Sequence, residues 1–142
     1  MLRPWIYKDK EFDEKLAEYF QGFVYCLTDQ ENSKKYIGKK NFWRLVKRQP
    51  LKGQKRRRIE KKPSDWKTYT GSSVEVNELI ENKTDFFREI LYLCRSKGEM
   101  TYYEAKEQFE REVLLKPEEY YNAFIGLKLH RKHILKLVEE KG

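Results

Sequence analysis

Residues 23–38 read FVYCLTDQENSKKYIG, and this stretch decides the kind of fold that we expect. Residues 23–27 are rich in β-forming side chains, and residues 28–34 are polar and typical of a turn. Residues 35–38 then resume a short strand-like run. The pattern therefore predicts a β-hairpin.

Helices are expected on both sides of this hairpin. Phe12 and Leu16 are one helical turn apart, and Gly22 follows as a stop signal. Ser72 and Glu75 have the spacing of a capping box. The predicted helices cover residues 10–21, residues 41–47, about ten residues that end near Asn82, residues 101–115 with a second capping box at Thr101 and Glu104, and a basic segment within residues 123–142.

Residues 86–94 read FFREILYLC and give the strongest strand signal in the chain. Burial on both faces is expected, which places this strand at or next to the middle of the sheet. The helix after it is expected to bury Tyr102, Ala105, Phe109 and Val113. We therefore predict one α/β (α+β) domain over residues 1–142, with a core at about 22–122 and a small three-stranded antiparallel sheet flanked by helices.

Positive charge is concentrated in one segment. The 142 residues include 31 Lys and Arg against 23 Asp and Glu, a net charge of +8, and residues 52–62 (KGQKRRRIEKK) hold seven basic side chains and one Glu. We expect residues 50–63 to be an exposed insert that contacts a polyanion, although a solvated run that only improves solubility has the same composition. The predicted DNA-contacting residues are Lys39, Lys40, Lys52, Lys55, Arg56, Arg57, Arg58, Lys61 and Lys62.

Several classes of protein are disfavoured. No apolar run approaches the ~20 residues that a membrane span needs, and the N-terminus lacks the apolar core of a secretory signal. Cys26 and Cys94 lie in apolar runs without metal-ligand spacing, so we interpret both as reduced core thiols of an intracellular protein.

Two tripeptides of the hairpin carry a resemblance to a known family. Phe23-Val24-Tyr25 and Tyr36-Ile37-Gly38, ten residues apart, resemble the paired motif of the GIY-YIG nuclease superfamily, most closely its small freestanding phage-type (Seg-like homing) members. The later residues Tyr69, in a YxGSS-like turn, Glu107 and Asn122 match further family positions. For the family arginine, Arg44 fits the spacing best, but the insert also offers Arg56, Arg57 and Arg58.

The resemblance implies a divalent-metal-dependent DNA endonuclease. In that reading Tyr25 is the general base, Tyr36 orients water or phosphate, Arg44 and Tyr69 complete the site, and Asn122 supports it. Glu107 would be the ligand of Mg²⁺, or of Mn²⁺ in its place, since such ions keep waters and accept phosphate oxygens. The implied partner is double-stranded DNA in the cytoplasm of an infected bacterial host, and a homodimer would supply two sites.

Other readings of the same residues stay open. The two tyrosines also suit a cross-strand aromatic pair, and Glu104, Glu107 and Glu110 also suit a solvated acidic helix face. Trp43 and Trp66 could anchor the insert or stack on bases. The alternative functions are a non-catalytic nucleic-acid-binding module on the same fold and a basic RNA-binding protein. His130 and His133 are read as surface histidines rather than as a metal pair.

Overall fold

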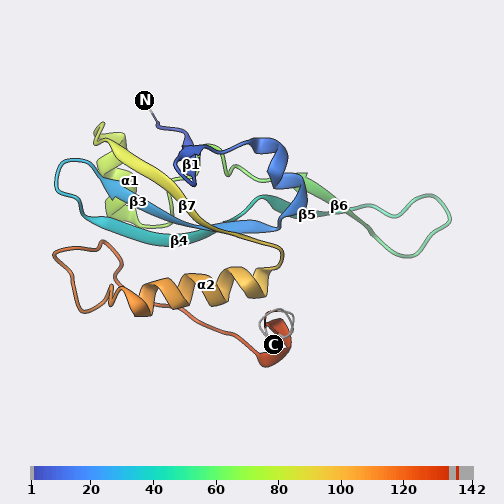
Figure 1. Cartoon of the computed structure of the whole chain (residues 1–142). Helices are drawn as coiled ribbons and strands as arrows, with labels where there is room; N and C mark the ends of the chain where they lie inside the picture. The colour runs from blue at the N-terminus through green and yellow to red at the C-terminus, as the bar shows by residue number, and fades with distance from the viewer. Residues whose placement is uncertain (1, 135–136, 138–142) are drawn as a thin grey trace.

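The computed structural model describes residues 2–134 and 137 and has mixed α+β architecture (Figure 1). Its main sheet has five strands in the order β2-β1-β7-β3-β4, and a separate two-stranded sheet is formed by β5 and β6. The predicted three-stranded sheet therefore covers only part of the main sheet. The strands are β1 (Trp5–Tyr7), β2 (Lys10–Glu11), β3 (Gly22–Asp29), β4 (Lys35–Asn41), β5 (Trp43–Arg48), β6 (Arg58–Pro63) and β7 (Phe86–Cys94).

The predicted hairpin and the predicted central strand are both confirmed. β3 and β4 pair in antiparallel fashion, with Tyr25 opposite Gly38 and Leu27 opposite Tyr36. β7 lies in the middle of the sheet, between β3 and β1. The sheet also contains two strands that the sequence pattern does not predict, β1, which runs parallel to β7, and β2. Both are very short, so they carry little of the alternation that identifies a strand.

Successive side chains of β3 pack alternately into two hydrophobic cores, one on each face of the sheet. Phe23 and Tyr25 join an aromatic core with Val76 of α1 (Val74–Glu81). Val24 and Cys26 join a second core with Met100 of α2 (Lys97–Glu110). Figure 1 shows α2 running along one face of the sheet. Cys26 and Cys94 are both buried and free, as expected for core thiols.

Two of the predicted helices are wrong in type. Residues 10–21 contain β2 and a 3-10 helix, η1 (Glu14–Tyr19), which begins where the Asp13 carboxylate accepts a hydrogen bond from the amide of Lys15. Residues 41–47 form most of β5, which pairs with β6. Aromatic and β-branched side chains suit a strand better than a helix, and the pairing partner lies beyond the basic loop. The insert at 50–63 is accordingly a hairpin tip plus β6.

Two other helices are correct in type but shifted. α1 ends at Glu81, with Asn82 as its C-cap, close to the predicted end near Asn82, but its N-cap is Ser73, which accepts from the amide of Val76. α2 begins before the predicted Thr101 because Ser96 caps it, and it ends at Glu110 rather than at residue 115. Met100 and Gln108 are buried with Ala105, whereas Phe109 is 60% exposed, so the predicted buried stripe is partly wrong.

The C-terminal helix prediction is wrong for residues 123–130, which form no regular element; a 3-10 helix, η2 (Arg131–His133), follows. The remainder of that predicted helix lies outside the described residues, apart from residues 134 and 137. The His130 and His133 rings contact each other at 5.2 Å between centroids. Within residues 2–134 and 137, no helix has the length and apolar character needed to cross a bilayer.

The outer edge of β4 is partly closed by residues 119–122. The amide of Lys35 donates to the carbonyl of Glu119, and the amide of Tyr121 donates to the carbonyl of Lys35. The Asn122 side chain then accepts from the amide of Ile37 at 3.0 Å and donates to its carbonyl at 2.9 Å. This amide thereby pairs the backbone of β4 in place of another strand.

We predict that Asn122→Ala lowers the free energy of unfolding by about 2 kcal/mol, because the buried amide of Ile37 loses its acceptor. Urea denaturation measures the effect. Glu118→Ala is the control, since that exposed side chain lies in the same segment. Equal stability of the two variants would show that the Asn122 contact does not hold the edge.

Candidate functional site

Three tyrosines gather on the α1 side of the sheet. Tyr25 of β3 lies 6.4 Å from the ring of Tyr36 on β4 and 6.2 Å from the ring of Tyr69 in the loop before α1. Tyr25 is 1% exposed, whereas Tyr36 and Tyr69 are half-buried. The hairpin motif and the YxGSS-like turn therefore meet at one cluster, which we call the tyrosine cluster.

The absence of a side chain at Gly38 makes this cluster possible. A Cβ built on Gly38 would lie 2.4 Å from the Tyr25 hydroxyl oxygen, so the phenol passes directly over the glycine backbone. Gly71 has φ of +88° and approaches the same hydroxyl from the other side. The pairing of β3 with β7 also shifts register between Val24 and Tyr25, and such bulges redirect side chains. These backbone features set the position of the Tyr25 hydroxyl.

The loop that carries Tyr69 is fixed from two sides. On the α1 side, Asn77 donates to the carbonyl of Gly71 at 3.0 Å, and the hydroxyls of Tyr36 and Ser72 are 3.2 Å apart. On the sheet side, Arg88 of β7 donates to the carbonyl of Tyr69 at 2.8 Å. The turn is thus a rigid wall of the tyrosine cluster.

Arg88 is a buried cation behind the tyrosines. It is 2% exposed, its guanidinium lies 4.0 Å from the centre of the Trp5 ring, and it also donates to the carbonyls of Arg3 and Lys67. Its Nε finds no hydrogen-bond partner within the described part of the chain. Burial lowers the pKa of Arg88 to about 10, and the neighbouring Tyr25 acts in the opposite direction. Arg88 therefore places positive charge on the core side of Tyr25.

Glu104 of α2 reaches the tyrosine cluster across the edge of β4. Its carboxylate lies 3.7 Å from the ammonium of Lys39, which also donates to Thr101 at 3.0 Å. Its charge acts on both Tyr25 and Tyr69. The sequence pattern marks Glu104 only as a capping residue or a member of an acidic face, so its position at the groove is a finding of the structure.

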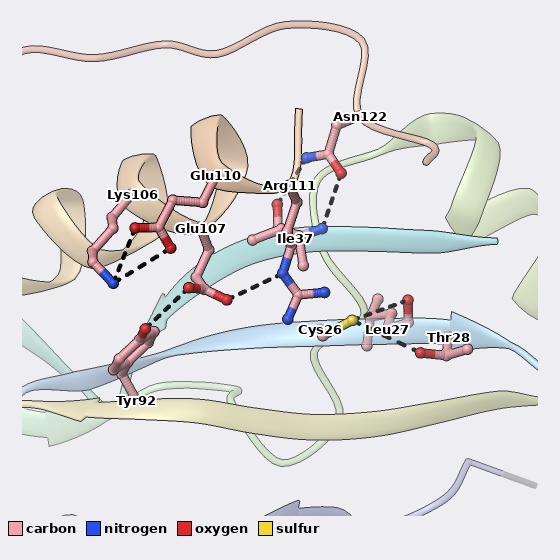
Figure 2. Close-up of polar contacts among 10 residues, drawn as sticks. All are labelled: Cys26, Leu27, Thr28, Ile37, Tyr92, Lys106, Glu107, Glu110, Arg111 and Asn122. Carbon is pink, nitrogen blue, oxygen red and sulfur yellow. Dashed lines mark hydrogen bonds and ion pairs between the residues drawn. The ribbon is translucent and has the colours of Figure 1, made fainter. Parts of the chain in front are cut away.

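Glu107 lies elsewhere on α2. Figure 2 shows its carboxylate between Tyr92 of β7, which donates at 3.0 Å, and Arg111, which donates at 3.1 Å. Both oxygens have partners, and the contacts belong to the α2 side of the sheet. The structure therefore does not bring Glu107 to Tyr25, Tyr36 and Tyr69.

A groove of about 540 Å³ opens at this edge of β4. Tyr36, Lys39, Glu104 and Asn122 all line it, so side chains from both faces of the sheet reach one solvent-accessible space. Asn122 contributes to the wall while both polar atoms of its amide remain bound to Ile37, as Figure 2 shows. Its direct role is therefore to hold the strand between Tyr36 and Gly38.

Arg44 lies outside the tyrosine cluster, at the base of the β5–β6 hairpin. It lines a separate pocket of about 690 Å³ with Lys40, Asp65 and Lys97. Lys40 connects this pocket to the cluster, because its ammonium pairs with Asp65 at 2.6 Å and lies 4.1 Å from the centre of the Tyr69 ring. The other predicted DNA-contacting residues lie on the hairpin or, for Lys39, at Glu104. Lys52, Lys55, Arg56, Arg57, Arg58 and Lys61 are exposed and Lys62 is half-buried.

Burial sets the protonation of the cluster. Loss of solvation raises the pKa of Tyr25 well above its ordinary value, and neighbouring Tyr36, Tyr69 and Glu104 raise it further. Burial also raises the pKa of Tyr69 and that of Glu104, although Lys39 opposes the shift at Glu104. Tyr25 and Tyr69 are therefore neutral phenols at pH 7.

The described residues contain no group of three or more His, Cys, Asp or Glu side chains that could hold a metal ion together. A single carboxylate next to an open groove still suits Mg²⁺, which proteins often bind through one or two carboxylates plus substrate phosphates. Glu104 has this arrangement, since it lines the groove and, among the described residues, forms one ion pair, the 3.7 Å contact with Lys39.

We predict that Gly38→Ala lowers the free energy of unfolding by about 1–3 kcal/mol, because the new methyl group overlaps the Tyr25 phenol. Urea denaturation of Gly38→Ala, Tyr25→Leu and the double variant measures the coupling, and the shorter leucine should relieve part of the cost. Gly126→Ala is the matched control, because its Cβ would meet only ordinary contacts. Purely additive effects at residues 25 and 38 would contradict the overlap.

A second prediction follows from the raised pKa of Tyr25. Above pH ~10 the unfolded chain loses this phenolic proton while the folded protein keeps it, so stability falls with pH by about 1.4 kcal/mol per unit for this group. Tyr25→Phe should remove that part of the slope. Urea denaturation between pH 9 and 11 tests it, and parallel slopes for the two proteins would mean that Tyr25 ionises in the folded state.

Comparisons with known proteins identify the family of this chain. The family model described as "Putative endonuclease segE, GIY-YIG domain" matches residues 5–125, which include the tyrosine cluster, α2 and the segment that closes β4. No curated protein and no solved structure matched the chain. The family supports nuclease function and implies DNA as the substrate class. The chain belongs to the SegE-type GIY-YIG domain family, a Seg-like branch of the GIY-YIG nucleases.

Proposed function

We propose that this protein is a divalent-metal-dependent DNA endonuclease that hydrolyses phosphodiester bonds at the tyrosine cluster. The observation that carries the proposal is that Tyr36 and Glu104 line one groove at the edge of β4, and that the buried ring of Tyr25 lies 6.4 Å from that of Tyr36. The neighbouring strands β3 and β4 supply the two tyrosines, and α2, much later in the chain, supplies Glu104. Phenols beside a carboxylate and lysines suit the handling of a proton and of phosphate charge.

We assign the metal-binding role to Glu104 instead of Glu107. Glu104 faces the groove, whereas Glu107 is held by Tyr92 and Arg111. Mg²⁺, or Mn²⁺ in its place, would be held by Glu104 and by phosphate oxygens of the DNA. When bound, it supplies positive charge that stabilises the charge developing on the phosphate.

The side chains of this chain then divide the remaining work. Tyr25 would accept the proton of the attacking water at its hydroxyl oxygen once it has released its own phenolic proton. Half-buried Tyr69, whose ring lies 6.2 Å away, would relay that proton by giving up its own hydroxyl proton to solvent as it accepts the one from Tyr25. Because burial raises the pKa of Tyr25, this transfer requires positive charge near the phenol. Arg88 lies on its core side, and the metal and Lys39 would lie on its groove side.

Positioning of the substrate falls to the groups around the groove. Tyr36, whose hydroxyl lies 3.2 Å from that of Ser72, would orient the water or a phosphate oxygen. Lys39 and Lys40, on opposite faces of β4, would bind phosphates on either side of the site. Asn122 acts through the backbone of Ile37 and so holds the strand that carries Tyr36.

The resemblance to phage-type Seg-like proteins supports a narrower context. In that context the protein would act as a homing-type enzyme on double-stranded DNA in the cytoplasm of an infected bacterium. A homodimer would provide the two sites needed to cut both strands.

We expect Glu104→Gln to lower the rate of supercoiled-plasmid nicking in Mg²⁺ by about 100-fold or more, because a neutral amide binds the ion poorly. Glu107→Gln is the matched control, since it is isosteric, lies one turn along the same helix and should keep a rate within a few-fold of wild type. Assays in Mg²⁺, Mn²⁺ and EDTA complete the set.

The opposite ranking of the two variants would return the metal-binding role to Glu107. Tight binding of DNA by the wild-type protein, with no cleavage in either metal, would show a binding module that keeps the fold without the reaction.

A further inference from the structure

We propose that the β5–β6 hairpin is a DNA-binding ribbon that enters the major groove with the face that carries Arg44, Arg48, Arg58 and Lys62. The inference rests on the proposed function and specifies how that enzyme holds its substrate. It also gives Arg44 a role in DNA binding instead of one at the reacting phosphate.

The first argument is the distribution of charge. Residues 43–63 contain ten Lys and Arg and one Glu, which gives 10 − 1 = +9. The rest of the chain contains 31 − 10 = 21 basic and 23 − 1 = 22 acidic residues, which gives −1. The hairpin therefore accounts for the whole net positive charge of the protein. A polyanion would be attracted to this one element more than to any other part of the chain.

The second argument is shape. β5 and β6 form a sheet of their own, and Figure 1 shows them extending away from the main sheet with the connecting loop at the far end. The major groove is about 12 Å wide and admits a two-stranded ribbon, whereas the minor groove is about 6 Å wide and has to be deformed to accept one. Two-stranded ribbons are an established way of reading DNA.

The third argument is that the two faces of the ribbon differ. The register pairs Arg44 with Lys62 and Arg48 with Arg58, so these four side chains share one face, where Val46 and Glu60 form the intervening pair. Arginines on such a face can bind phosphates or guanine edges through two parallel hydrogen bonds. We call this the arginine face.

The opposite face holds the ribbon together. This face carries Trp43, Leu45 and Ile59 at neighbouring and diagonal positions of the two strands. The Lys61 ammonium lies 4.3 Å from the centre of the Trp43 ring. Leu45 and Ile59 are 66% and 65% exposed. An isolated two-stranded hairpin is marginally stable in water, and cross-strand apolar contacts of this kind support it. On the arginine face the Arg48 guanidinium pairs with the Glu60 carboxylate at 2.6 Å, so DNA would compete with Glu60 for this arginine.

The base of the ribbon is attached firmly to the domain. The Trp43 indole donates to the carbonyls of Ala17 and Phe20 at 3.0 and 3.1 Å, and Ser64 donates to the carbonyl of Phe42 at 2.8 Å. Lys40 and Arg44 line one pocket at this base, and Lys40 also contacts Tyr69. A DNA backbone bound along the arginine face would therefore continue past Lys40 to the tyrosine cluster.

Binding of a fluorescent duplex by the Glu104→Gln protein in EDTA tests the proposal without cleavage. Arg48→Gln with Arg58→Gln should weaken binding about tenfold and reduce the salt slope by about 2, since each lost phosphate contact contributes about 0.9. Glu60→Gln should tighten binding, because it removes the one acidic side chain of the ribbon. Lys10→Gln with Lys83→Gln is the control, with the same change of charge at exposed positions off the hairpin.

The groove is tested by competition. Methyl green, which occupies the major groove, should displace the protein, and netropsin, which occupies the minor groove, should not. Displacement by netropsin alone would overturn the proposal, as would equal weakening by the hairpin and control pairs. Because these measurements need no cleavage, a wild-type protein that binds in this manner but does not nick DNA would refute the proposed function and leave the binding mode intact.

Discussion

The close packing of the Tyr25 phenol over Gly38 is the contact on which the rest of the site depends. It brings a core residue of β3 to the edge strand β4, with the hydroxyl enclosed by the bare backbone of Gly38 on one side and Gly71 on the other. Because the approach is so close, the turn after Tyr69 has to be held in place. Asn77 and Arg88 provide that support from opposite sides. The two glycines are therefore part of the site as much as the phenols are.

The edge of the sheet explains how groups from two separate cores can act together. Tyr25 and Tyr36 belong to the α1 face, whereas Lys39 and Glu104 belong to the α2 face, and a complete sheet would keep them apart. They meet because β4 is the last strand and because residues 119–122 cover only part of its edge. An uncovered strand edge is ordinarily a liability for aggregation. Here the groove occupies it, and nearby lysines discourage pairing with another strand.

The parts of this structure that follow from sequence are those that depend on local pattern. The hairpin, the central strand and the end of α1 follow from β-propensity, alternation and capping. Local pattern predicts a helix for residues 41–47, which instead form most of β5. The strand partner of β5 lies beyond the basic loop, and strand pairing over such a distance leaves no local signal. Glu104 was missed for a related reason: only the true N-cap at Ser96, together with the packing of α2 on β4, determines which glutamate faces the groove. The chemistry of Tyr36 and Asn122 stays a prediction, although their positions agree with it.

Arg88 extends the functional unit well beyond its recognisable motifs. Its guanidinium donates hydrogen bonds to the carbonyls of Arg3, Lys67 and Tyr69 and stacks on the Trp5 ring. The same side chain therefore holds both the N-terminal segment with the first strand and the turn beside the tyrosines. A fragment that started at the hairpin would keep both tripeptides yet leave this cation without one of its acceptors and without its aromatic neighbour. A stable form of this domain therefore needs the segment that begins upstream of β1, some twenty residues before the first motif that a reader of the sequence would notice.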